Sequence, residues 1–346
     1  MPNPSDQRGE SISYRAFWQQ VFALALPVAF QSALVSALAM ADVLMVGHLG
    51  SQAVAAVGLA AKLNFVLILV MAALGTGCSI LCAQYFGASR HEKVRQTLAL
   101  SQCVGALIML PFTVLVILNA EVLVRLGSQD PAVVQLGTPY MALLGLTLFT
   151  TQGIIIYESA MRAIGRTGWP LKYAIVAIAL NIIMNYWFIN GGLGIPALGV
   201  TGAAVATVLA RVFQIGWMTV DVQRTRTLHL SVSAFTGLRH STLPKRFFTL
   251  TWPLVLNFTL WSVGTLGYTL IAGRMGTVPL AVMSLLAPIE GMYHSLFFGL
   301  VNACGIMIGQ RLGRGQFDEA QWLANRFMWM APLGSLMVGI LLLVGS

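Results

Sequence analysis

The chain has 346 residues, of which 57% are hydrophobic and only 9% are charged, and its formal net charge is +9. A soluble domain carries roughly 25% charged residues, so this composition excludes a water-soluble protein and indicates a multi-pass membrane protein. The positive charge does not indicate a nucleic-acid partner, because the basic residues fall in the links between apolar segments, where they report membrane topology.

Nine apolar stretches are long enough to cross the ~30 Å hydrocarbon core of a bilayer as helices of about 20 residues. In chain order we expect these membrane helices near residues 17–46, 53–84, 96–118, 132–157, 173–189, 199–220, 247–273, 279–309 and 327–345. Lys and Arg gather before the first helix and in the link after every second helix, so the positive-inside rule predicts that these parts are cytoplasmic. The polar residues 1–16 lack the pattern of a signal peptide, and the first helix is expected to stay in the mature protein.

The sequence contains an internal repeat, in which residues 17–120 recur without a gap as residues 243–346. Identical pairs at the constant offset of 226 include Pro27/Pro253, Cys78/Cys304, Gln84/Gln310 and Gly87/Gly313. Counterparts of residues 121–226 are missing from the second copy, and a complete second copy would bring the chain to about 450 residues. We therefore expect a C-terminally truncated form that has a complete first lobe and cannot perform alternating access alone.

The repeat predicts the architecture. The first copy has six helices, an even number, so the second copy enters the membrane in the same direction. We expect an all-α polytopic membrane protein with two pseudo-symmetric parallel six-helix lobes, the second represented by three helices only, and substrate bound between them near mid-membrane. The expected parts are a cytoplasmic N-terminus (1–16), an N-lobe (17–220), a cytoplasmic connector (221–246) and a partial C-lobe (247–346).

A few polar residues inside the apolar stretches are candidates for a functional site. Asp42 is the only charge between residues 16 and 47, and a carboxylate inside a membrane helix costs ~2.5–3.5 kcal/mol. Asn181 and Asn185 share one helix face, and Asp42 and Asn185 each lie about four residues from the outer end of their helices. Thr207 could complete an oxygen-rich cluster suited to a proton or to a small hard cation such as Na⁺. The alternatives are interhelical hydrogen bonding by Asn and Thr, and pairing of Asp42 with Lys62.

Two further residues stand out inside the predicted helices. Pro27 lies near the middle of the first helix, where the missing N–H gives the helix a place to bend, although membrane helices also tolerate proline without such a role. Glu290 is a second intramembrane carboxylate, at the position equivalent to Asn64. It is a candidate site for cationic substrate or protons, and pairing with a buried basic group is the alternative. Arg211 is interpreted as a structural residue of the bundle.

Several motifs together resemble the multidrug and toxic compound extrusion (MATE) family. They are DVLMVGHLG at 42–50, AQYFG at 83–87, RAIGRTGWP at 162–170, NIIMN at 181–185 and GVTGAAVAT at 199–207. The resemblance implies a twelve-helix, two-lobe antiporter that expels cationic and amphipathic compounds against an inward flow of H⁺ or Na⁺ and uses no cofactor. The expected partners are such a small molecule and the lipid bilayer, in a bacterial inner membrane.

The resemblance also implies roles for individual residues. It assigns the family's ion-site aspartate to Asp42, its polar pair on the fifth helix to Asn181 and Asn185, its threonine to Thr207 and its bending proline to Pro27. Some members carry a glutamate in the seventh helix, and the corresponding position here is Trp261. Coupling through a carboxylate at that position is therefore not expected.

Two other classes of membrane protein fit the sequence less well than an antiporter. A lipid-linked oligosaccharide flippase of the same superfamily would be expected to line its cavity with several basic residues for pyrophosphate, and only Lys62 and Arg211 are candidates. A membrane enzyme is disfavoured because no HExxH motif, catalytic carboxylate pair or Ser/His/Asp set is recognisable. The sequence leaves open the choice between H⁺ and Na⁺.

Overall fold

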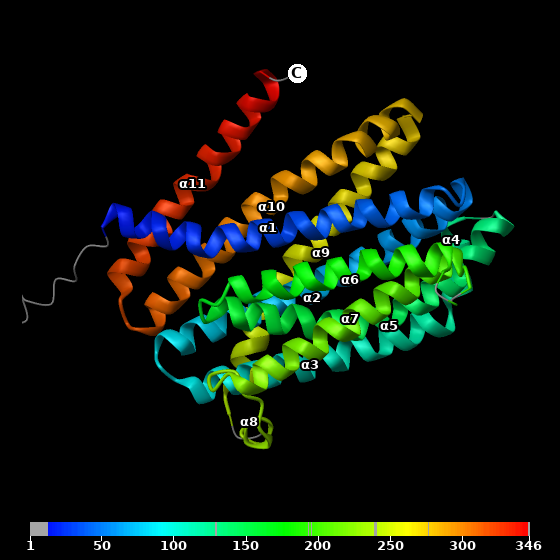
Figure 1. Cartoon of the computed structure of the whole chain (residues 1–346). Helices are drawn as coiled ribbons and strands as arrows, with labels where there is room; N and C mark the ends of the chain where they lie inside the picture. Colours follow the sequence, from blue (N-terminus) through cyan, green and yellow to red (C-terminus); the bar gives the residue numbers. More distant parts are fainter. Residues whose placement is uncertain are drawn as a thin grey trace, which may run out of the picture.

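The computed structural model describes residues 13–128, 130–192, 194, 196–238, 241–275 and 277–344, apart from the side chains of some residues inside helices. These ranges contain eleven helices (Figure 1). The helices are α1 (Tyr14–Gly47), α2 (Ser51–Gly87), α3 (His91–Leu118), α4 (Ala120–Gly127), α5 (Pro131–Ala163), α6 (Gly168–Asn190), α7 (Gly199–Arg224), α8 (Val232–Thr236), α9 (Leu243–Met275), α10 (Thr277–Gly313) and α11 (Phe317–Val344).

A helix occupies each of the nine predicted stretches, which correspond to α1, α2, α3, α5, α6, α7, α9, α10 and α11. Eight of them contain, within the described residues, a segment long and apolar enough to cross a membrane. The sequence did not predict the short helices α4 and α8. In α4, Ala120 and Val124 are buried while Glu121 and Arg125 form an exposed ion pair, so this helix presents one apolar face to the bundle.

The long helices pack into one bundle, from which α11 projects (Figure 1). Helix α5 packs against α2, α3 and α7, and α6 packs against α7. Helix α1 lies between two neighbours, α10 on one side and α6 on the other (Figure 1). Fully buried side chains such as Met71, Met109 and Ile156 fill the spaces between the first seven helices. The bundle therefore holds α1 against helices from both copies of the repeat.

Helices α2 and α10, which are equivalent in the repeat, cross closely at Gly87 and Gly313. A side chain on Gly87 would overlap the backbone carbonyl of Gln310, and one on Gly313 would overlap that of Gln84. Gln84 and Gln310 are themselves equivalent positions. The crossing thus places matching residues of the two copies against each other, backbone to backbone.

Further contacts join the two copies at the end of the bundle where α2 ends and α9 begins. Arg246 donates from Nη2 to Gln84 Oε1 at 2.7 Å, and its guanidinium carbon lies 5.5 Å from the ring centre of Tyr85. Gln310 Nε2 donates to the carbonyl of Ala163 at 2.9 Å. The guanidinium carbon of Arg326, in α11, lies 5.7 Å from the ring centre of Phe17 in α1. Polar and cation–π contacts therefore hold this end together.

Candidate functional site

The four residues predicted to form an ion-coupling site meet in one chain of hydrogen bonds. Asn185 Nδ2 donates to Asp42 Oδ1 at 2.7 Å and to Asn181 Oδ1 at 3.0 Å. Asn181 Nδ2 donates in turn to Thr207 Oγ1 at 3.2 Å. The chain links α1, α6 and α7. The described partner of Asp42 is thus the amide of Asn185. The alternative partner, Lys62, has a side chain that lies outside the described residues, so that pairing stays a prediction.

Helical spacing explains how α6 joins the other two helices. Asn181 and Asn185 lie one turn apart on the face that α6 turns inward, and they are 2% and 0% exposed. Thr207 donates its own proton to the Ala203 carbonyl at 3.0 Å, which leaves the hydroxyl oxygen free to accept from Asn181. The side-chain oxygen of Asn185 is buried and has no partner among the described residues. A buried acceptor without a partner costs about 1–3 kcal/mol, so this oxygen favours an added ligand.

The arrangement is suited to holding a small positive charge. Carboxylate, amide and hydroxyl oxygens are the ligands that hard cations prefer, and the carboxylate of Asp42 can instead take up a proton. Arg211, one turn beyond Thr207, donates to Gln214 Oε1 at 3.1 Å within the same helix.

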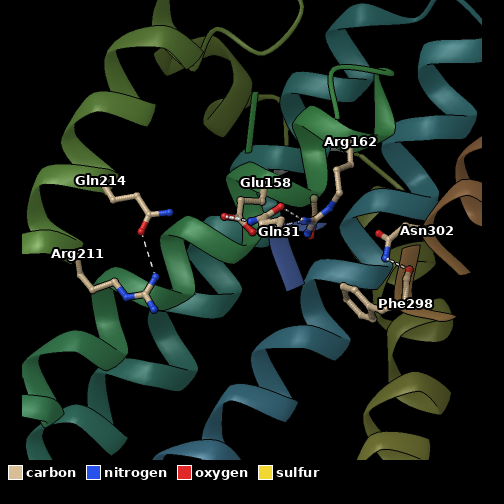
Figure 2. A network of polar contacts seen from close by, with 8 residues as sticks. Gln31, Glu158, Arg162, Arg211, Gln214, Phe298 and Asn302 are labelled. Atoms are coloured by element: carbon tan, nitrogen blue, oxygen red, sulfur yellow. Dashed lines mark hydrogen bonds and ion pairs between the residues drawn. The ribbon is translucent and has the colours of Figure 1, made fainter. Parts of the chain in front are cut away.

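A second buried polar group, which the sequence did not predict, surrounds Gln31 of α1 (Figure 2). Gln31 Nε2 donates to Glu158 Oε1 at 2.8 Å, and Arg162 Nη1 lies 3.4 Å from both Gln31 Oε1 and Glu158 Oε2. Arg162 also donates to Ser159 Oγ at 3.4 Å. The side chains of Arg162 and Glu158 are only 7% and 10% exposed.

The helix predicted near 132–157 would leave Arg162 among the basic residues of the following link. That placement was wrong, because α5 continues to Ala163 and buries this side chain. The signal that could have found the group is the spacing of Glu158 and Arg162. Opposite charges four residues apart, directly continuing an apolar helix, face the same side and pair.

The remaining predicted residues lie elsewhere. Pro27 is inside α1, one turn before Gln31. Glu290 belongs to α10, but its side chain lies outside the described residues, so its role stays a prediction. Trp261, at the position where some family members carry a glutamate, is 45% exposed, and its ring lies 6.0 Å from that of His294.

An apolar pocket of about 240 Å³ lies between α2, α3, α4 and α5. Met141, Leu144 and Leu148 line it, together with Asn64, whose side-chain oxygen is buried without a partner among the described residues. The pocket could hold the apolar part of a ligand next to one hydrogen-bond acceptor.

A model of the MatE family matches residues 27–187 and 253–346. The chain belongs to the MatE family. The two matched segments begin at Pro27 and Pro253, which are the equivalent prolines of the repeat. The MatE family consists of transporters, not of enzymes, and the chain is accordingly a multi-pass membrane protein.

Curated relatives carry multidrug-resistance names. A probable multidrug resistance protein NorM of Agrobacterium fabrum is 28% identical over 284 residues, which cover 80% of this chain and 60% of the relative. A probable NorM of Mesorhizobium japonicum is 26% identical over 343 residues, covering 93% of this chain and 71% of the relative. The chain thus spans about 60–70% of the length of these MatE relatives.

Solved structures share the fold. A multidrug resistance MATE family transporter in an outward-facing conformation superposes with a TM-score of 0.82 at 21% identity, covering 92% of this chain and 70% of that one. A mutant of the Vibrio cholerae MATE transporter VcmN gives a TM-score of 0.85 at 22% identity, covering 94% and 73%. At this level of identity, the likeness is evidence for the MatE fold alone.

Proposed function

We propose that this protein works as a secondary active antiporter, exporting cationic or amphipathic compounds in exchange for H⁺ or Na⁺. Asp42, Asn181, Asn185 and Thr207 are the proposed coupling site, and Pro27 is the proposed bending point of α1. In this proposal residues 17–220 form one lobe and residues 247–346 part of a second, with the connector 221–246 between them and the substrate bound at their interface.

The observation that carries the proposal is the hydrogen-bond chain across α1, α6 and α7. A carboxylate inside a membrane helix is costly and is normally kept for a purpose. Here Asp42 is held by Asn185, next to a buried amide oxygen that lacks a partner. An arriving proton or cation would neutralise Asp42, while a cationic substrate would compete for the same charge. Such competition at one carboxylate is the simplest means of exchanging one positive species for another.

The multidrug-resistance names of the relatives agree with this chemistry. The apolar pocket beside Asn64 would suit the apolar part of an amphipathic compound. Glu290 is proposed as a second acidic position for substrate or protons.

A transport assay tests the proposal. Because the chain spans about 60% of the NorM relative from Agrobacterium, the assay uses the chain both as it is and extended to the length of the relatives. Proteoliposomes loaded with a fluorescent cation are exposed separately to an imposed proton gradient and an imposed sodium gradient. We expect one of the two gradients to accelerate export by the extended chain. Export that ignores both gradients would contradict the antiport proposal.

The topology of the proposal has its own test. The basic links predict a cytoplasmic N-terminus and connector. In a variant without the native cysteines, a cysteine at Ser128 should react with an impermeant thiol reagent added outside intact cells, and a cysteine at Ser233 should not. The reverse pattern would invert the assignment.

A further inference from the structure

The proline of α1 leaves one backbone carbonyl without its usual partner. Proline has no N–H, so the carbonyl of Ala23, four residues before Pro27, loses its helical hydrogen bond. The hydroxyl of Thr167 donates to this carbonyl at 3.1 Å. Thr167 is the N-cap residue of α6, yet its side chain makes no cap hydrogen bond there, and it is 3% exposed. The position that usually caps its own helix therefore serves α1 instead.

This contact is specific to one proline. Beyond the first turn of a described helix, prolines lie at positions 27, 111, 139, 253, 288 and 332. The side chains around Pro288 lie outside the described residues, so the comparison concerns the other five. Among these five prolines, and within the described residues, only Pro27 frees a carbonyl that accepts a hydrogen bond from a side chain of another segment. A general tolerance of membrane helices for proline does not account for this difference.

On the other side of Pro27, α1 is held a second time. Gln31 lies four residues after the proline and is 6% exposed. Its amide nitrogen donates to Glu158 at 2.8 Å, and its amide oxygen lies 3.4 Å from Arg162 (Figure 2). Both partners belong to the last two turns of α5, directly before the link that carries Thr167. The continuous segment 158–167 thus bonds to α1 one turn before and one turn after Pro27.

We propose that Glu158, Arg162 and Thr167 form a latch that holds α1 straight across Pro27, and that α1 bends only when this latch opens. The latch rests on the proposed antiport function in one respect, since it gives the bending of α1 a role in the transport cycle. Its members are positioning residues: they hold the helix that carries Asp42 and touch neither ion nor substrate. This proposal gives the RAIGRTGWP motif at 162–170 a role, because Arg162 and Thr167 belong to it.

The geometry predicts how far the outer part of α1 moves when the latch opens. Met40 lies 13 residues beyond Pro27, or about 20 Å along the helix, so a bend of about 20° displaces it by ~7 Å. Spin labels on cysteines placed at Met40 and Leu118, both exposed, report this displacement as a distance distribution. A second pair at Gln19 and Arg90 lies before the bend and should not change.

The experiment compares variants of the purified chain in nanodiscs, in a background without the four native cysteines. Thr167→Val keeps the shape and removes the hydroxyl, so we expect the Met40–Leu118 distribution to shift or broaden by several ångströms. Thr167→Ser restores the hydroxyl and should restore the original distribution. Combined with Pro27→Ala, Thr167→Val should have no effect, because alanine supplies the N–H that the Ala23 carbonyl needs.

Two results would overturn the latch. One is an unchanged distribution in Thr167→Val, and the other is the same shift with and without Pro27. If Thr167→Val does not fold, Gln31→Met replaces the amide with a side chain of similar shape, and the same two criteria apply to it. Because the readout is a distance, it stands apart from transport: a latch confirmed in a chain whose extended form exports nothing would count against the antiport proposal alone.

Discussion

Helices α1 and α9 contain equivalent prolines but lie in different surroundings. At the repeat offset, Pro27 corresponds to Pro253 and Asp42 to Tyr268. The carboxylate of Asp42 is bonded to Asn185 of α6, whereas Tyr268 is 71% exposed. The same local sequence feature, a proline near the middle of an apolar helix, therefore accompanies an organised polar site in one copy and an exposed side chain in the other.

The difference shows that the helices packed around a helix proline determine whether polar contacts form beside it. Gln31 is buried between α1 and α5, while its counterpart Asn257 is exposed. Among the described residues, no side chain donates to the Thr249 carbonyl that Pro253 frees, whereas Thr167 donates to the Ala23 carbonyl. The polar partners of α1 come from α5, α6 and the link between them.

The largest expected effect concerns the ion pair that holds α1. Arg162→Leu leaves Glu158 buried without its partner and should lower the free energy of unfolding by ~3–5 kcal/mol. Arg125→Leu is the matched control, because it breaks a Glu–Arg pair of the same spacing whose side chains are 56% and 58% exposed, and should cost at most ~1 kcal/mol. Denaturant unfolding in detergent measures both. Equal losses would mean that the buried pair does not hold the bundle.

Neutralising Asp42 should abolish coupled export and leave the fold intact. In the chain extended to the length of the relatives, Asp42→Asn keeps the shape and removes the charge, and we expect export to fall at least about 100-fold, equivalent to ~2.7 kcal/mol. The control Asp130→Asn changes an exposed aspartate that caps α5, a position where asparagine serves equally well. Tyr268→Phe, at the equivalent position of α9, should leave export unchanged. Export by Asp42→Asn with the normal ion response would refute the role of Asp42.

The crossing of α2 and α10 is where the two copies remain alike, and it should be sensitive to one methyl group. Gly313→Ala places a Cβ against the Gln84 carbonyl and should destabilise the protein by ~1–3 kcal/mol. Gly305→Ala, on the same helix with no atom within 4 Å of the added Cβ, should not destabilise it. Thermal unfolding of the two variants compares them, and a similar melting temperature for both would show that the crossing can relax.

The comparison between the prolines is tested directly by removing each of them. In the extended chain, Pro27→Ala should stiffen α1 and lower the export rate about tenfold, equivalent to ~1.4 kcal/mol, because bending of α1 is proposed to be part of the cycle. Pro253→Ala should lower it less, because no described side chain holds the carbonyl that Pro253 frees. Initial rates in proteoliposomes at equal protein density decide between them. A larger loss for Pro253→Ala would place the main bend in the other copy.

The sequence predicted the long helices because hydropathy summed over about 20 residues outweighs local detail. The sequence also predicted that Asp42, Asn181 and Asn185 lie close together, because helical spacing puts the two asparagines on one face and Asp42 lies at a similar depth. The ends of the helices were less well predicted. Helix α3 begins at His91, five residues before the predicted stretch, because its polar first turns lie beyond the apolar run.

Contacts between distant segments could not be predicted from the pattern. Arg162 was taken for a link residue because a basic charge next to an apolar helix usually indicates topology. Its burial depends on Gln31, 131 residues earlier in the chain. The hydrogen bond from Thr167 to Ala23 spans 144 residues. The local sequence around each residue gives no indication of its distant partner, so only the packed bundle reveals these pairs.

The close crossing at Gly87 and Gly313 has a mechanical consequence. It lies at the last residue of both α2 and α10, each of which has 37 residues and is therefore about 55 Å long. A change of about 10° in the angle between two rigid helices of this length would displace their far ends by roughly 10 Å. The two glycines let the helix ends meet backbone to backbone, so the angle at this crossing sets how far apart the other ends lie.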